Sequence, residues 1–272
     1  MFRKKDKSVV IEWLVENPPE NEDVVARIIL QAAAYDLSGL PSVSENLEIQ
    51  KTPDENWLQK CYREFPPFSI GPFYIFGSHH EGQPEADVPQ GQIGLQIDAT
   101  TAFGSGEHET TKGCLQALLD LKGKGVCPWN ILDMGTGSGI LALAAWKLWS
   151  APVLAVDNDD EAVRVTERHA AMNGVTLGKG CLLAVCGDGF KTPAVDSHKP
   201  YELIIMNILA GPVIEMAPKA VRVLDENGYV ILSGMLKEQA DLVTSAYEGL
   251  GLTLTGRYDL GDWTALALQK RL

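Results

Sequence analysis

Short apolar runs alternate with longer amphipathic stretches from about residue 92 to residue 250. The apolar runs have the length and composition of buried strands, whereas the amphipathic stretches repeat apolar residues every three to four positions, as helices do. The expected strands span 93–97, 131–134, 153–157, 181–186, 201–206 and 229–233, and the expected helices span 110–121, 140–149, 160–172, 212–224 and 236–250. This alternation predicts an α/β fold in which helices cover both faces of a parallel sheet.

The last part of the chain breaks this alternation. Residues 252–258 and 263–268 both read as strands, and only residues 259–262 separate them. Because no crossover helix fits in so short a connection, the two strands must pair as an antiparallel hairpin. The chain from residue 131 onward therefore predicts a seven-stranded sheet, with five parallel strands followed by a terminal antiparallel hairpin.

The segment before residue 92 has a different character. A strand-like run over 8–15 precedes a helical pattern over 22–37, and 46–50 is a second strand candidate. A short helix over 54–61 is followed by an aromatic, proline-punctuated segment, which we expect to pack on the next domain. The expected domains are a small α+β N-terminal module over 1–53, a connector with the linker helix over 54–91, and an α/β domain over 92–272.

Composition narrows the class of function. The 272 residues carry a formal net charge of -13, which argues against DNA binding through phosphates and leaves room for a basic protein partner. No apolar run reaches transmembrane length, and the basic start lacks a signal-peptide cleavage site. The lack of such a run predicts no membrane association. The five cysteines form no C-x-x-C pair, so we expect a cytoplasmic protein with free thiols. His79 and His80 have no third ligand at metal spacing, so they predict a polar turn and no metal site.

Polar or glycine-rich residues follow the carboxyl ends of four successive strands of the expected sheet. They are Asp133 with Gly135, Gly137 and Gly139, then Asp157, then Asp188 between two glycines, and then Asn207. The carboxyl ends of parallel strands meet at one edge of a sheet, where open α/β sheets bind their ligands. We therefore expect these residues to line one crevice.

The glycine loop indicates which ligand binds in that crevice. Dinucleotide folds carry G-x-G-x-x-G, but Ile140 stands where the third glycine of that pattern would be. Asp133 would repel a phosphate, whereas it can hold an ammonium group directly or through water. These two residues argue for a small nucleoside such as S-adenosylmethionine, with Asp157 binding the ribose hydroxyls. Asp188 is expected either to bind the adenine amino group or to cap its turn.

Further stretches carry a resemblance to a known family. Residues 102–111, A-F-G-S-G-E-H-E-T-T, are similar to the F-G-T-G-x-H-x-T-T signature of the ribosomal protein L11 methyltransferases (PrmA). Residues 207–210 and 231–239 resemble the N-I-L-A and I-L-S-G-x-L-x-x-Q stretches of that family. The glycine loop, Asp157 and the terminal hairpin look like those of class I S-adenosylmethionine-dependent methyltransferases. The resemblance, which runs from about residue 56 to the end, thus implies a Rossmann-like fold.

The resemblance also implies an activity, a cofactor and a substrate. Family members trimethylate amino groups of a large-subunit ribosomal protein, both its N-terminal amine and lysine side chains. Their S-adenosylmethionine contacts would fall here on Thr111, Gly135, Asp157 and Asn207. The N-terminal module would recognise the ribosomal protein, although residues 1–53 supply only about half of the family's βαββαβ module. We expect a protein N-methyltransferase that acts as a monomer.

The chemistry of methyl transfer suggests roles for two residues. The amine must lose its proton and be held in line with the sulfonium. The side-chain carbonyl of Asn207 can accept a hydrogen bond from the amine and orient its lone pair, but it is too weak a base to remove the proton. His108 is a candidate general base, and the alternative is that it only orders the loop at 104–106.

Other functions stay open from the sequence. One is a methyltransferase for another protein or for a small-molecule amine, which the short N-terminal module would allow. Another is a non-catalytic, cofactor-binding protein of ribosome assembly. A nicotinamide-dependent oxidoreductase is disfavoured by Ile140 and Asp133.

Overall fold

The computed structural model describes residues 2–5, 8–11, 66–98 and 108–271, and the chain divides into two units, Met1–Glu55 and Asn56–Leu272. In the first unit, β1 (Phe2–Lys5) pairs antiparallel with β2 (Ser8–Ile11). The sequence pattern predicts β2 and misses β1. The helices expected over 22–37 and 54–61, and the strand over 46–50, lie outside the described residues.

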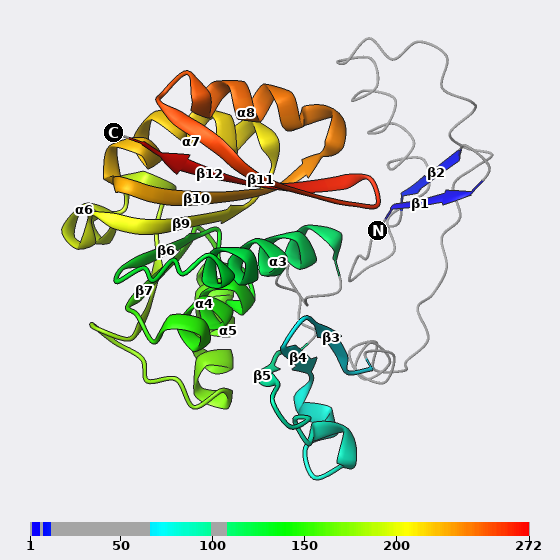
Figure 1. The fold of residues 1–272 in the computed structure, drawn as a ribbon. Helices are drawn as coiled ribbons and strands as arrows, with labels where there is room; N and C mark the ends of the chain where they lie inside the picture. Colours follow the sequence, from blue (N-terminus) through cyan, green and yellow to red (C-terminus); the bar gives the residue numbers. More distant parts are fainter. Residues whose placement is uncertain (1, 6–7, 12–65, 99–107, 272) are drawn as a thin grey trace, which may run out of the picture. The chain divides into compact units, whose positions relative to one another are not determined.

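Seven strands of the second unit form one sheet, in the order β11-β12-β10-β9-β6-β7-β8 (Figure 1). The strands are β6 (Ile131–Met134), β7 (Val153–Asp157), β8 (Leu182–Cys186), β9 (Tyr201–Asn207), β10 (Leu224–Leu236), β11 (Leu252–Leu260) and β12 (Trp263–Lys270). β6 to β10 pair in parallel with one another, whereas β12 runs antiparallel to both β10 and β11. The fold class predicted from the sequence, five parallel strands and a terminal hairpin, is confirmed.

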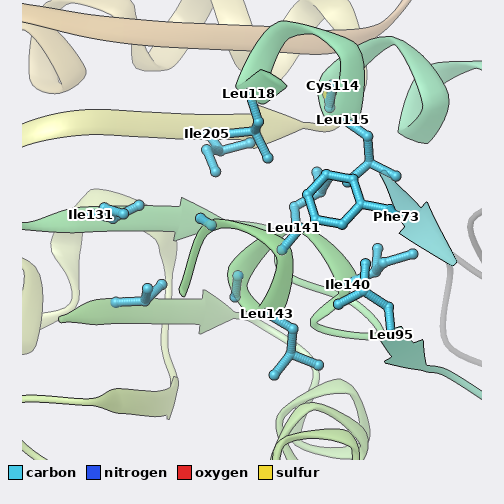
Figure 2. Close-up of a cluster of buried hydrophobic side chains, with 14 of the residues drawn as sticks. Phe73, Leu95, Cys114, Leu115, Leu118, Ile131, Ile140, Leu141, Leu143 and Ile205 are labelled. Carbon is cyan, nitrogen blue, oxygen red and sulfur yellow. The ribbon is translucent and has the colours of Figure 1, made fainter. Parts of the chain in front are cut away.

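Helices cover both faces of this sheet. They are α3 (Glu109–Gly123), α4 (Ile140–Trp149) and α5 (Asp160–Met172) on one side, and α6 (Pro193–His198), α7 (Ala210–Val223) and α8 (Ala240–Glu248) on the other. The central strands are buried on both faces, which explains their continuous apolar runs. The sheet has a hydrophobic core on each face: the first core lies between the sheet and α3, α4 and α5, and the second lies between the sheet and α6, α7 and α8. In β6, Ile131 faces the first core and Leu132 faces the second. Figure 2 shows the first core, where side chains of β6 and β9 meet those of α3 and α4.

The helical segments differ from expectation by more than two residues in two regions. The segment expected as a helix over 236–250 begins as the 3-10 helix η5 (Lys237–Gln239), and α8 follows it. The segment after β8, where the sequence pattern predicts no helix, contains η4 (Gly189–Lys191) and α6. Among the helices that the structure describes, none is both long and apolar enough to cross a membrane.

A second, three-stranded sheet precedes the large one in the chain. β3 (Phe68–Ile70) pairs antiparallel with β4 (Phe73–Phe76), and β4 pairs in parallel with β5 (Ile93–Gln96), so the strand expected over 93–97 is confirmed. Two short 3-10 helices, η2 (Ser78–His80) and η3 (Pro84–Ala86), lie between β4 and β5. Phe73 and Leu95 are fully buried in the first core, beside Leu115 of α3 (Figure 2). The aromatic segment therefore packs on the α/β domain, and the small sheet spans the boundary expected at residue 91.

Side chains at the end of α5 hold β5 in place. Oδ1 of Asn173 accepts a hydrogen bond from the backbone amide of Gln96 at 3.0 Å, and Nδ2 of Asn173 donates one to the backbone carbonyl oxygen of Gln96 at 2.8 Å. One turn earlier, Nε2 of His169 accepts a hydrogen bond from the amide of Asp98 at 3.1 Å. These bonds satisfy backbone groups that a neighbouring strand would otherwise satisfy. They also fix the backbone at Asp98, the last residue that the structure describes before residue 108.

Candidate active site

A loop with three glycines joins β6 to α4 at the carboxyl edge of the sheet. Gly135, Gly137 and Gly139 have φ angles of 75°, 56° and 80°, in the left-handed region that strains any residue with a Cβ atom. The amides of Gly135 and Thr136 donate hydrogen bonds to the carbonyl oxygen of Val156, at 2.7 and 3.1 Å. These bonds hold the loop against the end of β7, so it lies at the edge where the sequence predicts a ligand.

Asp133 lies beneath the glycine loop and is only 1% exposed. Its Oδ2 accepts hydrogen bonds from the hydroxyl of Thr136 at 2.8 Å and from the amide of Ala142 at 3.1 Å. Burial raises the pKa of its carboxyl to about 7, although these two hydrogen bonds oppose the rise. In the structure Asp133 therefore ties the loop to the first turn of α4. Its contact with a ligand's ammonium group stays a prediction.

Asp157 ends β7, one strand away from the loop. Its Oδ2 accepts a hydrogen bond from the amide of Gly137 at 2.9 Å, and its Oδ1 accepts one from the amide of Asp159 at 3.1 Å. Each carboxylate oxygen can accept more than one hydrogen bond, so both can still accept from ribose hydroxyls. The structure thus brings the acid and the glycine loop together, as the sequence predicts.

Asp188 follows β8 and is largely exposed, at 74% for its side chain. Its carboxylate forms an ion pair with Lys191 at 2.6 Å, which holds the pKa of Asp188 below its usual value. The side chain makes no capping hydrogen bond to η4. Of the two roles considered for Asp188, the turn cap therefore has no support in the structure, and adenine binding stays a prediction.

Asn207 and Thr111 meet although they are 96 positions apart in the chain. Asn207 ends β9, and its Nδ2 donates to the hydroxyl of Thr111, which is fully buried near the start of α3, at 3.5 Å. The other side-chain atom, Oδ1 of Asn207, is buried and has no hydrogen-bond partner among the described residues. A buried acceptor without a partner costs free energy, on the order of 1–3 kcal/mol, unless a ligand supplies the donor.

His108 caps the N-terminus of α3. Its Nδ1 accepts a hydrogen bond from the amide of Thr110 at 3.3 Å and lies 2.8 Å from the hydroxyl of the same residue. The ring packs edge-on against Trp263 of β12, with centroids 4.9 Å apart. Because Nδ1 serves the helix cap, a general-base role would fall to Nε2, and that role stays a hypothesis. The loop at 104–106 lies outside the described residues.

The histidine pair considered as metal ligands, His79 and His80, lies between β4 and β5 and not on the large sheet. His79 and His80 belong to η2, with ring centroids 4.0 Å apart. Within residues 66–98 and 108–271, no group of three or more His, Cys, Asp or Glu side chains could hold a metal ion.

Comparison with known proteins shows the family of the chain. The family model described as ribosomal protein L11 methyltransferase (PrmA) matches residues 3–271. The chain belongs to this family. A Rhizobium meliloti protein named ribosomal protein L11 methyltransferase is 38% identical over 265 residues, which are 97% of this chain and 87% of the relative.

Solved structures show the same fold. A ribosomal protein L11 methylase from Lactobacillus delbrueckii subsp. bulgaricus superposes with a TM-score of 0.65 at 28% identity, over 76% of this chain and 100% of that one. A methyltransferase from Pyrococcus furiosus superposes with a TM-score of 0.51 at 18% identity, over 65% of this chain and 90% of that one. The family match begins at residue 3, so it includes the N-terminal part that the sequence motifs, from residue 56 onward, do not reach.

Sequence reasoning missed the residue that joins the glycine loop to the Asn207 segment of this PrmA-family protein. A Cβ atom on Gly135 would lie 2.4 Å from Cγ2 of Ile208, and one on Gly234 would lie 2.2 Å from the carbonyl oxygen of Ile208. Ile208 is therefore held between two glycines with positive φ, one before α4 and one in β10. Only glycine allows so close an approach at both places.

Ser233 and His169 are further positioning residues that the sequence did not single out. Ser233 pairs with Asn207 in the ladder between β9 and β10, and its buried hydroxyl lies 3.3 Å from the carbonyl oxygen of Thr110 and 3.1 Å from that of Thr264. His169 places Nδ1 2.7 Å from the carbonyl oxygen of Ser138 in the glycine loop. The S-G pair within the family motif was a signal for Ser233. His169 had none, because its partners are distant in sequence.

Proposed function

We propose that this protein transfers methyl groups from S-adenosylmethionine to amino groups of ribosomal protein L11, both lysine side chains and the N-terminal amine. The observation that carries the proposal is the buried Oδ1 of Asn207, an acceptor without a partner among the described residues, next to the glycine loop. An amine is a donor and supplies the missing hydrogen bond. Membership of the PrmA family supports the choice of substrate.

The chemistry of the residues at the carboxyl edge of the sheet suits the proposed cofactor. Asp157 has acceptor capacity for ribose hydroxyls, and Asp188, exposed at the end of the neighbouring strand, would take the adenine amino group. Gly135, Gly137 and Gly139 have positive φ angles and give the loop the turns by which its backbone would face the ligand. Asp133 would face the methionine ammonium from below the loop, and Thr111 would contact the cofactor beside Asn207. When bound, the cofactor supplies a methyl group on a positively charged sulfur.

The chain's own residues would prepare the amine. Oδ1 of Asn207 accepts a hydrogen bond from the amine and turns its lone pair toward the methyl carbon. The proton of the ammonium leaves beforehand, to water or to Nε2 of His108. Thr111 keeps the amide of Asn207 in its orientation, through the 3.5 Å contact to Nδ2.

The charge of the chain bears on its partner. The net charge of -13 suits a basic ribosomal protein as the partner and disfavours DNA. We place the reaction in the cytoplasm, with the enzyme as a monomer and residues 1–53 as the part that recognises the ribosomal protein.

Binding and transfer are tested separately. Calorimetry with S-adenosylmethionine and with NAD should give binding for the first and none for the second. Purified ribosomal protein L11 incubated with labelled cofactor should gain methyl groups at amines, which mass spectrometry locates. Asn207→Ala should bind the cofactor with a weaker Kd, because Asn207 is one of several expected cofactor contacts, and should lose turnover at saturating cofactor by about a hundredfold or more. If the wild type binds the cofactor but labels no ribosomal protein, the assigned substrate is wrong, and a different amine or a non-catalytic role replaces it.

A further inference from the structure

Leu209 lies two positions after Asn207 and is the most exposed of the large hydrophobic residues that the structure describes, at 70%. Single exposed apolar side chains are common on protein surfaces, so exposure alone carries no argument. The position of Leu209 in the fold is what suggests a role. It lies at the carboxyl edge of the sheet, where β9 ends and α7 begins.

Leu209 is also the N-cap of α7, and it is a poor residue for that position. The cap has no side-chain hydrogen bond. Serine, threonine, aspartate and asparagine are strongly preferred at an N-cap because their oxygen accepts a bond from a free amide of the first turn. Pro212 has no N–H, so the amide of Gly211 is the group that such a cap would take. An exposed leucine here thus gives up helix stability and leaves apolar surface in water.

The backbone around Leu209 is held firmly. Ile208 is enclosed by Gly135 and Gly234, and the amide of Val213 donates to the carbonyl oxygen of Leu209 at 3.2 Å. Two residues of extended chain span at most about 7 Å, so the Cα atom of Leu209 lies within about 7 Å of that of Asn207. A leucine side chain at this distance can contact the stem of a ligand held by Asn207. A residue that breaks local rules at a rigid position beside a reactive group is a candidate for a functional role.

We propose that Leu209 is a specificity-determining residue that packs against the methylene stem of the substrate lysine while Asn207 holds its amine. This inference rests on the proposed function. A lysine side chain lays its apolar stem along apolar surface and keeps its nitrogen for polar partners. An apolar wall beside the amine also disfavours its charged form, so Leu209 assists the loss of the proton that precedes transfer.

The test compares the wild type with Leu209→Ser and Leu209→Met. For Leu209→Ser we expect an unchanged or higher Tm, because serine can cap α7, and an unchanged Kd for S-adenosylmethionine. We expect kcat/KM for ribosomal protein L11 to fall by about tenfold or more, and its pH profile to move to higher pH. Leu209→Met keeps an apolar side chain and should keep kcat/KM within about threefold of the wild type.

Leu250→Ser is the matched control. Leu250 is 39% exposed and lies between α8 and β11, at the opposite edge of the sheet from Asn207, so its variant should leave kcat/KM unchanged. The inference is overturned if Leu209→Ser keeps full kcat/KM, if it loses cofactor affinity by the same factor, or if its Tm falls. In each case the wild type still methylates and the proposed function stands. If the wild type transfers no methyl group to the ribosomal protein, the proposed function fails and this inference fails with it.

Discussion

Gly234 lies directly against the backbone of Ile208: a Cβ atom at Gly234 would be 2.2 Å from the carbonyl oxygen and 2.6 Å from the carbonyl carbon of Ile208. The contact couples β10 to the residue that follows Asn207 in the chain. Neither partner is a flexible side chain, so a methyl group added to Gly234 can be accommodated only if the Asn207 segment shifts.

Gly234→Ala should therefore harm both stability and activity. The φ of 86° alone costs about 1 kcal/mol for alanine, and the clash adds to that cost. Gly251→Ala is the matched control, because Gly251 has a φ of 91° and its Cβ would meet nothing within 4 Å. We expect Gly251→Ala to lower the free energy of unfolding without changing kcat, and Gly234→Ala to lower both. Equal losses of stability with equal kcat in the two variants would show that the contact with Ile208 does not position Asn207.

His169 connects the glycine loop to Asp98 and should make stability depend on pH. It is fully buried, with Nδ1 close to the carbonyl oxygen of Ser138 and Nε2 accepting from the amide of Asp98, an arrangement that requires the neutral ring. Burial lowers the pKa of His169 in the folded protein. The unfolded chain therefore takes up a proton first as the pH falls, and the stability that neutral His169 provides is lost below about pH 6.5.

Urea unfolding of the wild type and of His169→Gln from pH 8 to pH 5.5 measures this effect. At pH 8 the variant should be less stable by about 2–4 kcal/mol, because one side chain no longer reaches both partners. The difference between the two proteins should shrink as the pH falls. A constant difference across the range would mean that His169 does not titrate in this window.

The sequence predicts the large sheet well because its signals are local. The apolar runs of β6 and β9 and the intervening helical patterns are determined by burial of neighbouring residues, and the terminal strands can only pair as a hairpin. The convergence of Asp157, Asn207 and the glycine loop follows from the topology alone. These parts could be predicted before any contact was known.

Contacts between distant residues could not be predicted in this way. His169 looks like an ordinary polar residue of an amphipathic helix, but its two partners are 31 and 71 positions away. Ile208 gains its role from two glycines on different elements. For Asp133 the ligand contact stays a prediction, and the pattern gave no sign of its second role, the hydrogen bonds to groups of its own loop and helix three and nine positions on.

Asp133 should impose the opposite pH dependence from His169. Its pKa is raised from 3.8 to about 7 in the folded protein, so the unfolded chain loses the proton first as the pH rises. The contribution of protonated Asp133 to the free energy of unfolding is then fully present below about pH 4. It is lost as the pH rises toward 7, by an amount on the order of 4 kcal/mol. In Asp133→Asn the side-chain carbonyl oxygen of the new amide can accept both hydrogen bonds, and this variant should lack the pH-dependent loss. A parallel decline of stability in both proteins between pH 4 and 7.5 would place the titrating group elsewhere.

The two roles of His108 can be separated by a variant that keeps one of them. Asparagine is a favourable N-cap residue, so His108→Asn retains an acceptor for the amide of Thr110 but has no basic nitrogen. His108→Ala loses both the cap and the base. If His108 only caps α3, His108→Asn should keep the wild-type Tm and kcat, and His108→Ala should lose about 1 kcal/mol of stability.

If Nε2 of His108 accepts the proton of the substrate, both variants should lose kcat by about 100-fold or more, because general-base catalysis contributes on that scale. The packing of the ring on Trp263 and the use of Nδ1 by the cap favour the capping role, since they hold the ring toward α3 and β12. We therefore expect His108→Asn to retain kcat within about threefold. A large loss of kcat in His108→Asn at unchanged Tm and cofactor Kd would establish the base role instead.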